Sequence, residues 1–233
     1  MEKIIVYSAN INGYDDLVTP KIFDSNVEYI LFTDDEAFKS NVWNIKSIDF
    51  VDKNLDLRKR SRYMKLNPHK VLPPHDISIW IDHCFEPKFS NVQEMLEQLN
   101  FKGFNVMSYK HPERNCIYDE ANAVLKYSLD SVEVVSNQMK RYISVGYPMN
   151  YGLFENGFII RRNKDKVNFF NETWWNEVKN NSGRDQLSHM YASWFTDVRI
   201  NPINVGVSMS DNPFLNKKKQ HKKGFITKKR LKK

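Results

Sequence analysis

The chain has 233 residues, 41% of them hydrophobic and 13% aromatic, which is enough for one large α/β domain or two small ones. Its apolar runs reach only strand length, far below a membrane span, and the start "MEKIIVYSAN" lacks the pattern of a secretory signal. Two cysteines without CxxC spacing, Cys84 and Cys116, indicate reduced thiols in a cytosolic protein.

The net charge of +7 comes from the C-terminal end of the chain. Residues 217–233 hold ten Lys and Arg and no acid, so the remaining residues carry 25 basic against 28 acidic side chains. We therefore expect a mildly acidic globular domain at 1–215 and a basic tail at 216–233. The tail is either a solvated end or a contact for an anionic membrane surface, and nucleic acid is the least favoured partner. Apolar residues between the lysines favour the membrane over nucleic acid. The expected location is therefore the cytoplasm, with peripheral attachment at the inner face of the membrane as the alternative to a solvated tail.

The first half of the chain alternates strand-like runs with polar turns. Apolar runs predict strands in "KIIVYSANI", "VEYILFT", "NVWNIKSID", "ISIWI" and "FNVMSY". Helical spacing predicts one helix in "DLRKRSRYMKLNPHKVLP", which ends at a proline, and another in "SNVQEMLEQL", with Ser90 or Asn91 as its cap. Acids or amides follow three of these strands directly, in "SANING", "TDD" and "IDHC".

The second half is mainly helical. Helices are expected at 118–128, 131–145, 165–180 and 184–195, interrupted by one strand in "GFIIRR". Strands that alternate with helices predict a single α/β domain with a mainly parallel sheet flanked by helices. Such sheets bind ligands at the carboxyl ends of their strands, so the three polar strand ends are expected to form a site at one edge.

Four long blocks of the sequence carry a family resemblance. They are "SRYMKLNPHKVLPPHDISIWID", "HPERNCIYDEA", "GLFENGFIIRR" and "WWNEVKNNSGRDQLSHMY". From about Val6 to Tyr191 the chain resembles the glycosyltransferase-like domain of the plant mucilage-related and turgor-regulation-defect proteins and their bacterial relatives. The resemblance implies a GT-A-like (Rossmann-like) fold and a hexosyltransferase-like enzyme. Such an enzyme would move a sugar from a nucleotide-sugar donor to a glycan or glycoconjugate acceptor, in surface polysaccharide synthesis. The alternative is a non-catalytic glycan- or nucleotide-binding protein of the same fold.

The order of motifs is also similar, more distantly, to glycogenin-like transferases. In those enzymes a basic helix precedes a strand that ends in an acid-x-acid metal motif, and an Asp-Gln pair follows on a later helix. The matching residues here are Arg58, Arg62 and Lys65, then Asp82, then Asp185 and Gln186. Cys84 stands where the second acid would be, and a thiol suits Mg²⁺ or Mn²⁺ poorly. Metal binding at Asp82, with His221 of "HKKG" as a second candidate, is therefore expected to be weak, and a metal-independent mechanism is the alternative.

The candidate site residues have both functional and structural interpretations. Asp82 is a metal ligand, a donor-ribose contact or a strand cap. Arg58, Arg62 and Lys65 share a helix face, which either contacts the donor diphosphate or is solvated. Asp185 contacts the donor sugar, serves as a base or only complements a helix dipole. With Asp82 and Asp185 as catalytic candidates, the remaining expected donor contacts are Asn10, Asp34 and Gln186, and the expected acceptor or sugar contacts are His111, Arg114, Glu155, Asn156 and Trp175.

Overall fold

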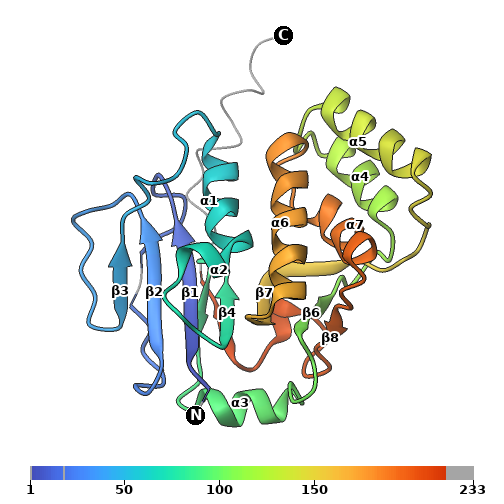
Figure 1. Cartoon of the computed structure of the whole chain (residues 1–233). Coiled ribbons are helices and arrows are strands. Elements are labelled where there is room, and N and C mark those ends of the chain that lie inside the picture. Colours follow the sequence, from blue (N-terminus) through green and yellow to red (C-terminus); the bar gives the residue numbers. More distant parts are fainter. Residues whose placement is uncertain (1, 18, 219–233) are drawn as a thin grey trace.

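A computed structural model describes residues 2–17 and 19–218. Its centre is a seven-stranded sheet in the order β3-β2-β1-β4-β7-β6-β8 (Figure 1), and two short strands, β5 and β9, form a separate pair. The strands are β1 (Ile4–Asn10), β2 (Glu28–Thr33), β3 (Trp43–Lys46), β4 (Ile77–Ile81), β5 (Phe85–Pro87), β6 (Val106–Lys110), β7 (Phe154–Arg162), β8 (Asn201–Pro202) and β9 (Leu215–Lys217).

All neighbouring strands of the large sheet are parallel except β7, which runs antiparallel to both β4 and β6. The expected architecture, a mainly parallel sheet flanked by helices in one domain, is confirmed. Because β1, β2 and β4 are parallel, the polar residues that follow them all emerge at the same edge of the sheet.

The helices are α1 (Leu57–Leu66), α2 (Pro68–Val71), α3 (Val92–Gln98), α4 (Ile117–Lys126), α5 (Val132–Ser144), α6 (Asp165–Asn180) and α7 (Gln186–Thr196). The single helix expected around residues 56–73 is divided in two. Asp56 caps α1 by accepting a hydrogen bond from the Lys59 amide at 2.9 Å, and α2 starts anew at Pro68, whose ring fits a first helical position but not a helix interior.

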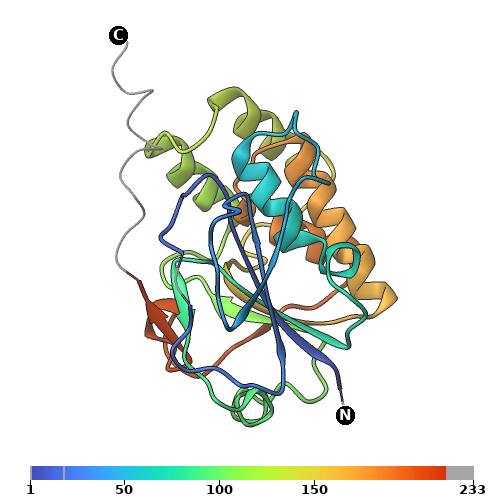
Figure 2. The same ribbon diagram turned by 90° about the vertical axis from the view of Figure 1, so that its left-hand side faces the viewer.

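Alternate side chains of the strands enter two separate apolar cores. In β1, Ile5 and Tyr7 join the core under α1, α4, α6 and α7, whereas Ile4 and Val6 join the core on the α3 side. Helices α1 and α6 lie side by side across the first face (Figures 1 and 2). Both faces of the central strands are therefore buried among the described residues, whereas their polar ends remain accessible.

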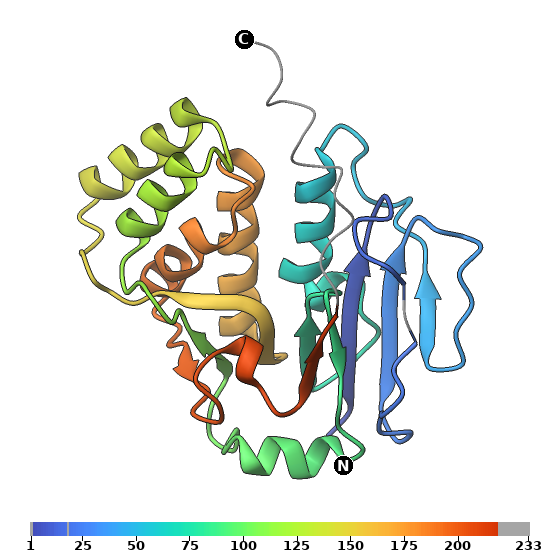
Figure 3. The same ribbon diagram turned by 180° about the vertical axis from the view of Figure 1, so that it is seen from behind.

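The C-terminal part of the described chain was not expected from the pattern of the sequence. Residues 203–214, which we call the strap, cross in front of the sheet from β8 to β9 (Figure 3). The domain boundary expected at residue 215 falls within β9, which pairs with β5, and the Lys218 amide donates to the Cys84 carbonyl at 2.9 Å. The rest of the basic tail, with His221, lies outside the described residues. Of the helices described, none combines the length and apolarity needed to cross a bilayer.

Candidate active site

A cavity of about 290 Å³ lies at the carboxyl edge of β1 and β4, between α1, the start of α7 and the strap. It brings together seven of the residues expected from the sequence. They are Arg62, Lys65, Asp82, Glu155, Asn156, Asp185 and Gln186. These residues come from α1, β4, β7 and α7, so the fold gathers groups that are more than 120 positions apart in the chain.

Lys65 links the two catalytic candidates. Its side chain is 1% exposed, and its Nζ lies 2.6 Å from Asp185 Oδ2 and 3.3 Å from Asp82 Oδ1. The ammonium also lies 5.6 Å from the centre of the Trp80 ring. Its backbone carbonyl accepts hydrogen bonds from Tyr7 Oη at 2.9 Å and Arg161 Nη2 at 2.7 Å. The end of α1 is thus held firmly, and Lys65 serves as the shared counter-ion of two carboxylates.

Asp185 is held in its ionised form. Burial alone would raise the pKa of this carboxyl, but the charges of Arg62 and Lys65 outweigh burial and hold the pKa well below its ordinary value. Arg62 Nε lies 3.4 Å from Asp185 Oδ2, and its side chain is 19% exposed. Burial lowers the pKa of the neighbouring Arg184, which also lines the cavity. Three cations therefore surround the two carboxylates Asp82 and Asp185.

Asp82 is the more accessible carboxylate, with its side chain 29% exposed. Its Oδ1 accepts a hydrogen bond from Trp80 Nε1 at 2.6 Å as well as the contact from Lys65. None of the described residues donates a hydrogen bond to Oδ2. Its amide donates to the Gly157 carbonyl at 2.7 Å, which ties the end of β4 to β7. One oxygen of Asp82 is consequently available to a ligand in the cavity.

An irregularity in β7 forms the floor of the cavity. Opposite β6 the register shifts between Ser108 and Tyr109, so residues 156–158 bulge out of the ladder. The hydroxyl of Ser108 lies within hydrogen-bond distance of the carbonyls of Glu155 and Phe158, so its single proton is shared between the two ends of the bulge. Asn156 is 4% exposed, and neither its amide nitrogen nor its amide oxygen has a partner among the described residues. A buried amide without partners at a cavity is a group that a bound ligand can satisfy.

Four other expected site residues hold local structure and do not line the cavity. The side chain of Asn10 exchanges hydrogen bonds with the backbone of Asp15, and Asp34 accepts from the Asn12 amide at 2.8 Å and 3.0 Å. These contacts shape the loop after β1. Arg58 donates to the Leu129 carbonyl at 3.1 Å and packs its stem on Gly183, and Trp175 packs edge-on against Tyr63. Because the spacing of Arg58 and Arg62 puts both on one face of α1, the sequence did not show that only Arg62 lines the cavity.

His111 and Arg114 form a separate cluster with Glu120. The two ring nitrogens of His111 contact the backbone amides after it and Arg114 Nη2, and Arg114 Nε donates to Glu120 Oε2 at 2.7 Å. Burial lowers the pKa of His111, and the charge of Arg114 lowers it further. This cluster fixes the turn between β6 and α4, and it does not line the cavity.

The described residues bring together few side chains that could ligate a divalent cation. They contain no group of three His, Cys, Asp or Glu side chains that could hold a metal. Burial and the nearby Asp82 raise the pKa of Cys84 to about 12, so its thiol stays protonated, and His83 is 3% exposed with its Nδ1 3.3 Å from Ser8 Oγ. Hard cations need about six oxygen ligands, and the free oxygen of Asp82 supplies one.

Arg184 and Met209 are among the lining residues that were absent from the expected site. Arg184 precedes Asp185 directly, and its place in "GRDQ" is the signal that could have identified it. Met209 reaches the cavity from the strap, and no local pattern in the sequence predicts that position. Only the return of the chain from β8 to β9 brings it there.

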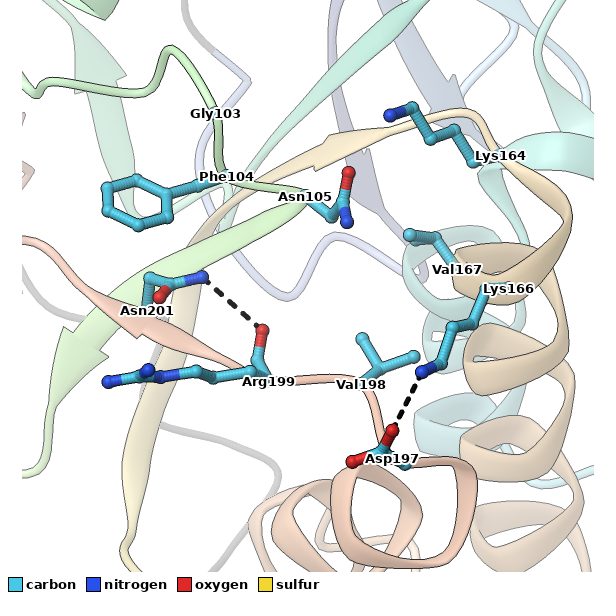
Figure 4. Close-up of a pocket in the computed structure, with 10 residues that line it drawn as sticks. All are labelled: Gly103, Phe104, Asn105, Lys164, Lys166, Val167, Asp197, Val198, Arg199 and Asn201. Carbon is cyan, nitrogen blue, oxygen red and sulfur yellow. Dashed lines mark hydrogen bonds and ion pairs between the residues drawn. The ribbon is translucent and has the colours of Figure 1, made fainter.

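A second cavity, of about 330 Å³, lies on the opposite edge of the sheet (Figure 4). The start of α6, the residues after α7 and the turn before β6 line it. Its charged groups are exposed, and Lys166 Nζ and Asp197 Oδ2 form an ion pair across it at 2.9 Å. It contains none of the expected site residues.

Comparisons with known proteins agree on one family. Residues 1–215 match the model of the TOD1/MUCI70 glycosyltransferase-like domain. The probable hexosyltransferase MUCI70 of Arabidopsis thaliana is 25% identical over 210 residues, which cover 79% of this chain and 36% of that protein. The chain thus spans about a third of the length of that relative.

Two solved glycosyltransferase structures are distant neighbours. The apo structure of the bifunctional glycosyltransferase WbbM is 12% identical, with a TM-score of 0.47, over 88% of this chain and 39% of that one. Mouse xyloside xylosyltransferase 1 in its apo form is 8% identical, with a TM-score of 0.48, over 86% of this chain and 84% of that one.

Proposed function

Since this chain belongs to the TOD1/MUCI70 family of glycosyltransferase-like domains, we propose that it transfers a sugar from a nucleotide-sugar donor to a glycan or glycoconjugate acceptor. The observation that carries the proposal is the cavity in which one buried lysine, Lys65, holds Asp82 and Asp185 together beside Arg62 and Arg184. The expected donor contacts Arg62 and Gln186 and the expected sugar contacts Glu155 and Asn156 line the same cavity.

The reaction breaks the bond between the anomeric carbon and the diphosphate and forms a bond from that carbon to an acceptor hydroxyl. The diphosphate leaves with the bonding electron pair, and the acceptor proton passes to a base. Positive charge must therefore face the leaving group. The three cations that line the cavity, Arg62, Lys65 and Arg184, all lie on its α1 and α7 side beside Asp185, whereas its other carboxylates (Asp15, Asp82 and Glu155) come from other elements. We therefore propose that Arg62 and Arg184 contact the diphosphate.

The two carboxylates differ in what they offer. Asp185 is locked between Lys65 and Arg62, which suits a fixed negative charge that orients these cations. Asp82 presents its Oδ2 to the cavity, and this oxygen is our candidate for contact with the sugar or for the base. A Mn²⁺ or Mg²⁺ ion would have to take most of its oxygen ligands from the donor phosphates, so we propose weak metal use or none.

A panel of nucleoside diphosphates and nucleotide sugars, with and without Mn²⁺, tests the proposal by thermal shift and by a transfer assay. A donor that binds the folded state raises the melting temperature. Asp82→Asn keeps the shape of the side chain, so it should abolish transfer while changing stability little. If Asp82→Asn retains full transfer, Asp82 is only a strand cap. If none of the compounds in the panel raises the melting temperature, the proposed function is wrong.

We further propose that the basic residues after Lys218 hold the protein at the inner face of an anionic membrane, near acceptors of surface polysaccharide synthesis. Eight Lys and Arg follow Lys218 in the sequence, and each basic residue near such a surface contributes about 1 kcal/mol. Removing residues 219–233 should weaken binding to phosphatidylserine vesicles and leave the melting temperature unchanged. Deletion from 217 would also remove the end of β9, so the cut belongs after Lys218.

A further inference from the structure

The strap is firmly attached where it passes the cavity. The Ile203 amide donates to the Ser108 carbonyl at 2.9 Å, Tyr109 Oη donates to the Val205 carbonyl at 2.6 Å, and the Lys88 amide donates to the Phe214 carbonyl at 2.8 Å. Between these anchors the strap makes a short 3-10 turn over Met209–Asp211. A segment anchored on both sides of a turn presents the side chains of that turn at a defined place.

Two contacts within the strap build this turn. The Val207 amide donates to Asp211 Oδ2 at 3.1 Å. Gly206 has a φ of +80°, and a Cβ there would lie 2.6 Å from the Asp211 carbonyl oxygen, so the position requires glycine. The backbone of this turn therefore fixes the position of Met209, its first residue.

Glu155 holds Met209 over the cavity floor. The Met209 amide donates to Glu155 Oε2 at 2.7 Å, which connects the strap to the bulged part of β7. The thioether of Met209 lies on Gly157, where a Cβ would be 2.3 Å from Sδ and 2.4 Å from Cε. That same Cβ would be 3.2 Å from Asp82 Oδ2, so the thioether and the free oxygen of Asp82 flank one glycine.

From this placement we infer that Met209 determines which donor sugars fit, by setting the size of the cavity beside Asp82. The inference rests on the proposed function and refers to the same site. A thioether fills space and forms only weak hydrogen bonds, so it excludes bulk without reading particular hydroxyls. Apolar walls of this kind discriminate about 10- to 200-fold for a methylene-sized difference in a substrate.

Glu155 has a positioning role in this arrangement. Its carboxylate accepts from the strap backbone, so its effect on a sugar passes through Met209. Glutamine retains an acceptor oxygen and should keep the strap in place, whereas alanine removes it. Rescue by Glu155→Gln therefore distinguishes positioning from a direct charge on the substrate.

The test measures, by calorimetry, the affinities of nucleotide sugars that carry xylose, glucose and N-acetylglucosamine on one base. The base is the one whose free diphosphate binds most tightly. Met209→Ala should raise the affinity for the largest sugar relative to the smallest about 10-fold or more, while the free diphosphate binds as it does to the unchanged protein. Glu155→Ala should change the ratio in the same direction, and Glu155→Gln should keep the original ratio.

Val207→Ala is the matched control, because Val207 lies on the same strap but is 82% exposed and does not line the cavity. It should leave every affinity unchanged. If the ratio of affinities for the largest and smallest sugars in Met209→Ala stays within twofold of that in the unchanged protein, while the free diphosphate still binds, the role of Met209 is wrong but the proposed function stands. Absence of binding by all nucleotides to every variant would overturn the proposed function as well.

Discussion

The two cavities described here have similar volumes, about 290 and 330 Å³, but their charged side chains differ in how far they are buried. At the carboxyl edge, Lys65 is 1% exposed and touches two carboxylates. At the opposite edge, Lys166 and Asp197 are 59% and 97% exposed and pair with each other. Water already solvates the second pair, so its formation contributes little, whereas the buried charges depend on each other. The comparison shows that burial of charge, and not volume, distinguishes the candidate active site.

The largest effect is expected from removing the charge of Lys65. Lys65→Met keeps the length of the side chain but removes its positive charge. Asp82 then loses its ion pair with Lys65, and of its contacts with Lys65 and Arg62, Asp185 keeps only the one with Arg62. Breaking a buried ion pair costs about 3–5 kcal/mol, so the free energy of unfolding should fall by about that amount in urea titrations. A loss below about 1 kcal/mol would contradict the view that the carboxyl-edge charges depend on Lys65.

A smaller effect is expected from Arg62→Ala on ligand binding. Arg62 lies at the cavity and is partly exposed, so a nucleoside diphosphate should lose a charged hydrogen bond worth about 1.5–3 kcal/mol. Calorimetry with the free diphosphate measures the loss. Arg199→Ala, at the opposite cavity, is the matched control and should bind unchanged. Equal losses in the two variants would mean that the diphosphate does not distinguish the two edges.

The acid stability of the protein should depend on Asp185. Its folded pKa lies below the unfolded value of about 3.9, so its ionised form stabilises the fold above that pH. This contribution is lost as pH falls from about 5 through the folded pKa. Asp185→Asn should therefore be less stable at pH 7, and its stability gap from the unchanged protein should narrow on acidification. A gap that stays constant between pH 7 and pH 3 would show that Asp185 is not held by Lys65 and Arg62.

The smallest effect is expected at the opposite cavity. Lys166→Met matches the Lys65 substitution but removes an exposed pair, and its free energy of unfolding should change by no more than about 0.5 kcal/mol. Urea titration in parallel with Lys65→Met checks it. A loss comparable to that of Lys65→Met would remove the contrast between the two edges.

Much of the framework could be predicted from the sequence because it depends on local pattern. The apolar runs located the strands β1, β2, β4 and β6, and helical spacing located α6 and, with its cap at Asn91, α3. The family-like blocks further indicated Arg62, Lys65, Asp82 and Asp185, which do lie in one cavity. Strand ends and helix starts are marked in a sequence, so residues at such positions can be assigned to an edge of the sheet.

What only the tertiary structure decided is how each polar side chain is used. Arg58 and Arg62 are one helical turn apart and look alike in the sequence, but Arg58 is drawn to the Leu129 carbonyl while Arg62 faces Asp185. Lys65 is a buried counter-ion because β4 and α7 each deliver a carboxylate to it. Met209 reaches Asp82 only because the strap returns from β8 to β9. Each of these contacts joins segments far apart in the chain, and local sequence pattern carries no information about such pairings.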